Sequence, residues 1–215
     1  MITVACVYWE GRFRRRRKMY DIEWVTRLKN MVERNLHVPH RFVCLSNVDV
    51  PCERIPLIHD WPGWFSKVEL HRPGLFTDRV LYLDLDELIL KDLTPFLAFP
   101  SSFAITNGRE YTTWFKEDLI KIRKYGSAVM VFDPGAGEKL YTEFEDRVIK
   151  VFWGHQDYVA WKMPELDTFP GNWLGRLEKD GDEEPHEDAI IVHCMLPGKN
   201  REAVRKHKWV EEIWQ

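Results

Sequence analysis

Two acidic residues lie where an apolar run ends. The stretch RVLYLDLDELIL (79–90) alternates as a buried strand does and carries Asp84 and Asp86 at its end. Because residues i and i+2 of a strand share a face, the two carboxylates are predicted to converge where the strand leaves its sheet. Such carboxylates repel each other unless a cation lies between them. Oxygen ligands without a nearby thiolate favour Mn²⁺ or Mg²⁺ over zinc. The alternative is that both are solvated or helix-capping acids.

The elements around this pair predict an α/β fold, a mostly parallel sheet flanked by helices. Apolar runs indicate strands at 2–9, 41–46, 54–58, 79–84, 101–107, 127–133 and 189–194. Amphipathic or short helical patterns indicate helices at 21–36, 64–70, 92–97, 137–152, 155–163 and 201–214, with Asp21 as the N-cap of the first. Alternation of this kind is typical of parallel sheets covered by helices. In open α/β sheets ligands bind beyond the carboxyl ends of the strands, where the acidic pair falls.

Composition limits the remaining possibilities. A chain of 215 residues with 45% apolar residues is predicted to form a single domain over 1–215. A net charge of −3 gives no global attraction to nucleic acid, so no nucleic-acid partner is expected. The four cysteines, Cys6, Cys44, Cys52 and Cys194, form no CxxC pair and are predicted to be free thiols. With neither a signal peptide nor a membrane-length apolar run, a cytoplasmic protein is expected.

Several motifs share the order found in one enzyme family. The stretch RVLYLDLDELILKDLTPF resembles the strand and DxD motif of GT-A-fold glycosyltransferases, most closely the retaining family 8 type. WFSKVEL (64–70), YGSAVMVFDPG (125–135), HQDYVAW (155–161) and IIVHCMLPGKNR (190–201) resemble further motifs of that family, over residues 2 to about 200. The resemblance implies metal-dependent transfer of a sugar from a nucleotide diphosphate donor, expected to be a uridine diphosphate sugar, to an acceptor, with retention.

The resemblance also implies a metal site. Asp84, Asp86 and His193 would be ligands to Mn²⁺ or Mg²⁺, and Gly198 and Lys199 would contact the donor phosphates. The sequence supports His193 independently, because it ends the predicted strand 189–194, which in a parallel sheet points toward the same edge. A core histidine is the alternative. The C-terminal strand and helix, about 189–215, are expected to close the donor site.

Further residues are expected to contact the donor. Tyr8 and Trp9 end the first strand where the family holds the base and ribose, although core packing explains them equally well. Lys67 would add positive charge near the nucleotide, or is a surface lysine. Leu85, between the two acids, and Asn107, after the strand 101–107, are also expected at the donor, with a turn role as the alternative for Asn107.

The motif HQDYVAW is expected to lie beside the reactive carbon of the sugar. Gln156 and Asp157 match its glutamine and aspartate, whereas His155 replaces the family's first aspartate. Glutamine is a poor nucleophile, so a front-face transfer is favoured, with Gln156 as positioner and Asp157 as a ligand to sugar hydroxyls.

Other interpretations remain open at this point. The basic run RFRRRRK (12–18) is interpreted as a solvated loop, a contact for an acidic acceptor or membrane surface, or a nucleic-acid patch. The acceptor, whether glycan, lipid-linked or protein, is unknown. Two rival functions are a DxD phosphohydrolase of the haloacid dehalogenase type and a sugar-nucleotide or glycan binder with little turnover. The first is disfavoured because its motif usually lies on the first strand, not at residue 84.

Overall fold

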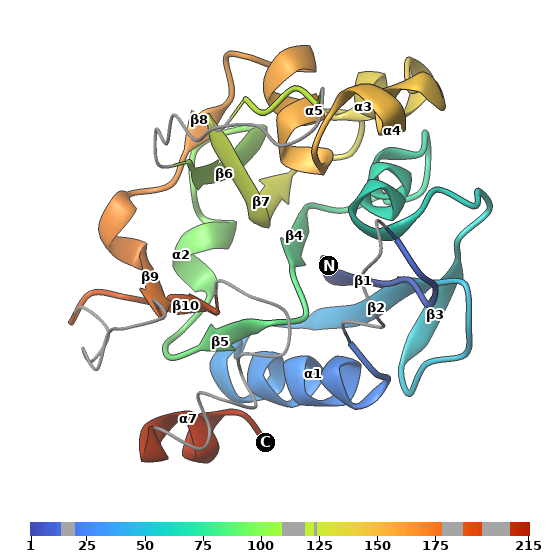
Figure 1. The fold of residues 1–215 in the computed structure, drawn as a ribbon. Helices are drawn as coiled ribbons and strands as arrows, with labels where there is room; N and C mark the ends of the chain where they lie inside the picture. The colour runs from blue at the N-terminus through green and yellow to red at the C-terminus, as the bar shows by residue number, and fades with distance from the viewer. Residues whose placement is uncertain (14–19, 109–118, 123, 178–186, 195–206) are drawn as a thin grey trace.

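A seven-stranded mixed sheet lies at the centre of the computed structural model, which describes residues 1–13, 20–108, 119–122, 124–177, 187–194 and 207–215. Its strand order is β3-β2-β1-β4-β7-β6-β8. The strands are β1 (Ile2–Tyr8), β2 (His40–Ser46), β3 (Glu53–Pro56), β4 (Val80–Leu83), β6 (Phe103–Asn107), β7 (Tyr125–Phe132) and β8 (Asp167–Thr168). The first four in this order pair in parallel, and β7 runs antiparallel to both β4 and β6. The predicted α/β class is confirmed (Figure 1).

The alternation of side chains along the strands divides the core into two layers. On β1, Val4 and Cys6 face one layer, whereas Ala5 and Val7 face the other. The first layer is covered by α1 (Glu23–Asn35), α2 (Thr94–Leu97), α7 (Lys208–Ile213) and a second, smaller sheet. The second is covered by η1 (Gly63–His71), α3 (Glu138–Thr142), α4 (Arg147–Val151) and α5 (His155–Lys162). Figure 1 shows α1 and α7 below the sheet and α3 to α5 above it.

Helix α1 fixes the position of the C-terminal helix. It begins at Glu23, two residues after the predicted cap, and the Asp21 carboxylate still accepts the Glu23 N–H at 3.2 Å. Arg27 pairs with Glu23 at 2.5 Å, as the i,i+4 spacing predicts, and also donates to the Trp214 carbonyl at 2.7 Å. Since the last carbonyls of a helix lack intrahelical partners, this bond helps to dock α7 on α1.

The second sheet has the order β5-β10-β9, formed by β5 (Glu87–Ile89), β10 (Ile191–Cys194) and β9 (Leu174–Leu177). The expectation that the last strand joins the main parallel sheet is wrong, because β10 runs antiparallel to β5 and parallel to β9. An apolar run predicts a buried strand but does not specify its neighbour. Here the neighbour is β5, which follows the acidic pair directly in the chain.

The predicted helix over 137–152 is two short helices, α3 and α4. The chain turns between them so that the Phe144 ring packs on Trp61, with centroids 4.4 Å apart, and Asp146 accepts the Trp61 indole N–H at 3.1 Å. Tertiary contacts therefore override the helical period of this segment. The predicted helix at 64–70 is a 3₁₀ helix, η1, in which residues three apart lie on the same side.

The structure bears on two predictions, the free thiols and the absence of a membrane-spanning helix. Cys6 and Cys44 are free, buried register partners on β1 and β2, and Cys52 is free and half-buried, whereas the Cys194 side chain lies outside the described residues. Within the described part of the chain, no helix combines the length and apolarity needed to cross a membrane.

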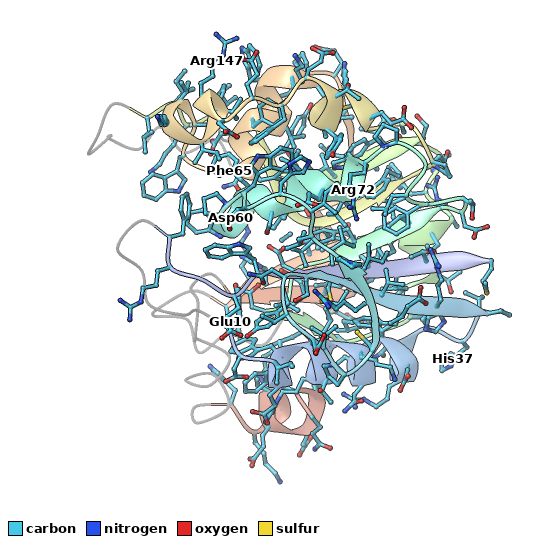
Figure 2. All side chains as sticks on the ribbon, turned by 90° about the vertical axis from the view of Figure 1, so that its right-hand side faces the viewer. Glu10, His37, Asp60, Phe65, Arg72 and Arg147 are labelled. Atoms are coloured by element: carbon cyan, nitrogen blue, oxygen red, sulfur yellow. The ribbon has the colours of Figure 1, made fainter. Side chains whose placement is uncertain are left out.

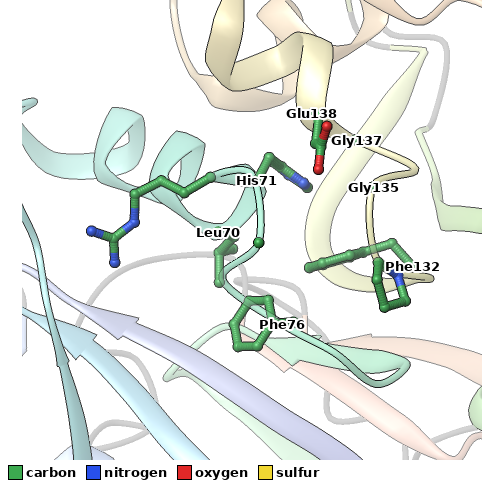
Figure 3. A pocket seen from close by; sticks show the side chains of 10 residues that line it. Leu70, His71, Phe76, Phe132, Gly135, Gly137 and Glu138 are labelled. Atoms are coloured by element: carbon green, nitrogen blue, oxygen red, sulfur yellow. The ribbon is translucent and has the colours of Figure 1, made fainter.

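Two histidines are enclosed in the second core layer. His71 ends η1 and His155 begins α5, their rings lie parallel with centroids 6.3 Å apart, and their nitrogens find no hydrogen-bond partner among the described residues. Figure 3 shows the His71 ring at the wall of a small pocket beside Gly137 and Glu138. Burial lowers the pKa of His71 to about 3 and holds the pKa of His155 well below its usual value. Both histidines are therefore neutral in the folded protein.

These histidines should make the protein sensitive to acid. The unfolded chain binds a proton at His71 below about pH 6.5 and the folded protein does not, so stability falls as pH drops through this range. For His71 alone the loss is about 2 kcal/mol by pH 5. We expect His71→Phe to remove this part of the pH dependence in denaturant unfolding between pH 7 and pH 5. Substitution of the exposed His37 by Gln is the control, and an equal change in slope for both variants would contradict the assignment.

Candidate metal and donor site

The acidic pair lies in a turn between two sheets. Strand β4 ends at Leu83, the Asp84 N–H bonds the Ala128 carbonyl at 2.8 Å, and the Glu87 N–H bonds the Asp84 carbonyl at 3.4 Å before β5 begins. The prediction that strand alternation places both carboxylates on one face is therefore wrong. The turn instead directs the two acids to different partners, described next.

Asp84 lies against η1. The Lys67 ammonium is 2.6 Å from the Oδ1 of Asp84 and also donates to the Ser127 carbonyl at 3.3 Å, and the Tyr82 hydroxyl donates to the same Oδ1. Lys67 is only 7% exposed, so the alternative of a solvated surface lysine is excluded for this structure. A buried ammonium next to a carboxylate supplies fixed positive charge at the end of β4.

Asp86 lies on the opposite side of the turn, against the entry to α1. The Tyr20 hydroxyl donates to its carboxylate at 2.9 Å, and the Tyr20 ring contacts Trp24 with centroids 5.1 Å apart. Trp24 in turn contacts Trp214 at the end of α7, at 4.8 Å. Burial, together with the nearby Asp86 carboxylate, raises the pKa of Tyr20. The tyrosine thus stays a hydrogen-bond donor that orients Asp86.

Glu87 and His193 face each other across the second sheet. They are register partners in the antiparallel pair β5–β10, and the His193 Nδ1 makes a short hydrogen bond to the Glu87 carboxylate. Burial raises the pKa of Glu87 to about 7, against the opposing effect of His193. Burial alone would lower the pKa of His193, but Glu87, Asp86 and Asp84 outweigh it and raise it to about 9. The imidazolium is therefore the counter-charge of this acidic centre.

The arrangement of these groups fits a divalent cation. Asp86, Glu87 and His193 can each offer a ligand atom, and these atoms lie within 4.8 Å of one another. The Oε2 of Glu87 is buried and has no hydrogen-bond partner among the described residues. Two carboxylates and an imidazole are ligands that Mn²⁺ accepts. The predicted ligands Asp86 and His193 lie in this cluster together with Glu87, whereas the predicted ligand Asp84 is paired with Lys67.

The first-strand residues expected at the nucleotide lie at the same edge. Tyr8 is 2% exposed and its hydroxyl donates to Glu10 at 3.0 Å, so its ring is part of the core. Trp9 is half-buried and its ring covers Gly11, where even a Cβ atom would lie 2.1 Å from the indole. Figure 2 shows Glu10 on the same side of the molecule as Phe65 of η1, with His37 on the opposite side.

The HQD motif forms the first turn of α5. Gln156 is half-buried there, but Asp157 is 1% exposed and accepts two backbone N–H groups, from Ile122 at 2.7 Å and from Gly154 at 3.0 Å. These bonds cap the helix and attach the segment 119–122 to it. His155, which replaces the family's aspartate, points into the core toward His71.

The remaining predicted donor residues are dispersed. Leu85 is 3% exposed and packs in the first core layer, and Asn107 is exposed at the end of β6. Gly198 and Lys199 lie outside the described residues. The residues that sequence reasoning missed are Glu87 and Tyr20. Glu87 directly follows the acidic pair, which was a usable signal, whereas nothing near Tyr20 in the sequence indicates its contact with Asp86.

Comparison with known proteins gives structural matches without sequence matches. No family description and no curated protein matches the sequence. The galactosyltransferase LgtC, solved with donor and acceptor sugar analogs, superposes with a TM-score of 0.64 at 12% identity, covering 99% of this chain and 96% of that one. The glycosyltransferase GlyE of Streptococcus pneumoniae gives 0.64 at 14% identity, covering 100% and 64%. The bifunctional glycosyltransferase WbbM gives 0.61 at 12% identity, covering 99% and 51%. The predicted glycosyltransferase fold is confirmed.

We expect Tyr20→Phe to weaken Mn²⁺ binding without unfolding the protein. Removal of the hydroxyl leaves Asp86 without the donor that orients it, and losses of about 10- to 100-fold in metal affinity are usual for such outer contacts. Calorimetric titration with Mn²⁺ measures the change. Tyr141→Phe, which removes a hydroxyl bonded to His59, is the matched control. Equal affinities in Tyr20→Phe and the unaltered protein would show that the contact does not orient a ligand.

Asp157→Asn should destabilise the fold by about 1–3 kcal/mol. The amide group would turn an N–H₂ toward one of two buried N–H donors that now bond carboxylate oxygens. Urea unfolding measures the loss, with exposed Glu165→Gln as the control. A variant as stable as the unaltered protein would mean that the Asp157 carboxylate is not a structural cap.

Proposed function

We propose that this protein transfers a sugar from a nucleotide diphosphate donor, a uridine diphosphate sugar, to an acceptor hydroxyl, with retention. The observation that carries the proposal is the cluster of the buried Asp86 and Glu87 with the half-buried His193, set beside the Lys67–Asp84 pair at the carboxyl edge of the parallel strands. The same fold in LgtC was solved with donor and acceptor sugar analogs, which supports this substrate class.

Each residue of the cluster has a distinct proposed task. Asp86 and His193 would hold a Mn²⁺ or Mg²⁺ ion, and Glu87 would orient the imidazole through Nδ1, leaving Nε2 for the ion. The ion, when bound, would stabilise the negative charge of the departing diphosphate. Lys67 supplies a second positive charge at the same edge. Asp84 is kept as the third proposed ligand. It now pairs with Lys67, so the Lys67 ammonium would have to move from Asp84 to a phosphate of the donor before Asp84 could bind the ion.

The transfer itself needs no nucleophile from the protein. The acceptor oxygen would bond to the anomeric carbon on the face from which the diphosphate leaves, the carbon–phosphate oxygen bond would break, and the acceptor proton would pass to the leaving diphosphate. Gln156, half-buried on the first turn of α5, would position the sugar. Because the Asp157 carboxylate already accepts two backbone N–H groups, we assign it to holding α5 and residues 119–122 in place.

We further propose that the chain acts as one domain, with residues 189–215 closing the donor site. The contacts that support this are the β5–β10 pairing and the bond from Arg27 to the Trp214 carbonyl. A cytoplasmic location is proposed on the free Cys6 and Cys44 thiols, which suit a reducing compartment.

The test is donor binding with and without metal. Asp86→Ala should lose Mn²⁺-dependent binding of a uridine diphosphate sugar in calorimetry, because it removes a ligand at the centre of the cluster. The control is Asp92→Ala, which removes an exposed carboxylate that caps the Thr94 N–H at 3.0 Å. Unchanged Mn²⁺-dependent affinity in Asp86→Ala would contradict the metal site.

Turnover decides between an enzyme and a binder. A transferase that binds its donor without an acceptor should hydrolyse it slowly and release nucleoside diphosphate, whereas a sugar-nucleotide binder would leave the donor intact. A panel of nucleotide sugars with Mn²⁺ would be assayed for both binding and hydrolysis. Activity toward simple phosphate esters instead would favour the phosphohydrolase alternative.

A further inference from the structure

Three aromatic rings from distant parts of the chain gather beside the candidate donor site. The rings of Trp64 and Trp153 have centroids 6.4 Å apart at an interplanar angle of 32°, and Phe13 meets Trp64 edge-on at 5.9 Å. All three side chains are half-buried and so keep part of their surface at the solvent. Clusters of large aromatic side chains that remain partly exposed mark binding surfaces more often than isolated ones do.

This cluster is continuous with the donor site on two sides. Trp64 precedes Lys67 by three residues in the 3₁₀ helix η1, where residues at this spacing lie on the same side, and Lys67 contacts Asp84. Trp153 precedes Gly154, the N-cap of α5, and Gln156 lies in the first turn of that helix. A molecule resting on the two tryptophans would therefore border the residues assigned to the phosphate and the sugar.

A lysine completes the surface. The Lys121 ammonium lies 4.0 Å from the centre of the Trp153 ring, within the range of a cation–π contact. The backbone beside it is held next to Trp153, because the Ile120 N–H bonds the Val151 carbonyl at 2.7 Å and the Trp153 N–H bonds the Ile120 carbonyl at 3.0 Å. In the sequence, Phe13 also belongs to the basic run 12–18.

We propose that Phe13, Trp64, Trp153 and Lys121 form an acceptor surface, and that its ligand is an acidic carbohydrate. A sugar ring presents an apolar C–H face that packs against an aromatic ring, while its hydroxyls stay in water. A carboxylate or phosphate on the sugar pairs with the Lys121 ammonium. This inference rests on the proposed function, since it assigns the second substrate of the same reaction.

The charge and the aromatic rings together select this ligand over others. A neutral glycan would use the tryptophans but not the charge of the lysine that lies over one ring. A membrane surface would also use Lys121, but the tryptophan pair borders the candidate donor site and would be better placed to bind an acceptor there. Neutral glycan and anionic lipid are therefore the competing ligands that the experiment must separate.

The test compares matched oligosaccharides on the full chain. The probes are a uronic-acid-containing hexasaccharide, its carboxyl-reduced neutral counterpart, a phosphorylated oligosaccharide and vesicles containing anionic lipid. We expect an acidic oligosaccharide to bind about two- to fivefold more tightly than the neutral one, with the preference lost at high salt. Preference for the carboxylated or for the phosphorylated probe identifies the acid. Equal affinity for acidic and neutral sugars, or binding to the vesicles alone, would overturn the proposal.

Variants locate the surface. Trp153→Ala should weaken all oligosaccharide binding by about tenfold, whereas Lys121→Gln should remove only the preference for acid. The control is Trp161→Ala, because Trp161 is a tryptophan on α5 that is 54% exposed and has the Lys162 ammonium 5.1 Å from its ring. If Trp161→Ala weakens binding as much as Trp153→Ala, the assignment fails. Lys121→Gln alters a surface side chain, so it stays informative if Trp153→Ala does not fold.

Donor binding separates this proposal from the one it rests on. Mn²⁺-dependent binding of the nucleotide sugar should be the same in Trp153→Ala, Lys121→Gln and the unaltered protein. Loss of acidic-sugar binding with intact donor binding in Trp153→Ala supports the acceptor surface. Acidic-sugar binding in a protein that binds no nucleotide sugar would refute the proposed transfer and with it the role of this surface as an acceptor site.

Discussion

The concentration of buried negative charge at the junction of the two sheets is the constraint on which this structure depends. Asp84, Asp86 and Glu87 lie within four residues of one another, and Asp86 and Glu87 are 4% and 0% exposed. Buried carboxylates without partners would be protonated or would destabilise the fold. Each has a partner from a different element: Lys67 from η1, Tyr20 before α1, and His193 from β10. The site therefore exists only when these segments are assembled.

The turn between β4 and β5 explains why one short motif can serve two layers of the protein. It leaves the Asp84 carboxylate in the layer of η1, where Lys67 reaches it, and places Asp86 and Glu87 in the layer of α1 and β10. The Lys67–Asp84 ion pair and the candidate metal ligands are thereby held on adjacent sides of one turn. The proposed contacts to a phosphate and to a cation need opposite charges, which this separation of the two acids would provide.

The sequence predicts the order and most boundaries of the elements, because periodicity reports which faces are buried. It does not predict strand partners, and for that reason it assigns β10 to the wrong sheet and misses β5 as a separate strand. The same inability to predict partners explains which contacts of the candidate site were missed. The predicted residues Asp86 and His193 lie in the cluster, whereas Asp84 is paired with Lys67. The pairing of Glu87 with His193 depends on the β5–β10 register, and that of Tyr20 with Asp86 depends on the packing of α1. Neither contact can be predicted from the residues next to it in the sequence.

The behaviour of Asp157 shows how a motif residue can act without touching a substrate. Its two carboxylate oxygens join the start of α5 to residues 119–122, and this segment carries Lys121 to the face of Trp153. One buried acid thus fixes Gln156 on one side and the segment that carries Lys121 on the other. Because both depend on the same two hydrogen bonds, the residue proposed to position the sugar and the proposed acceptor surface are structurally coupled. A transfer reaction requires that coupling, since its two substrates must meet at a fixed separation for the new bond to form.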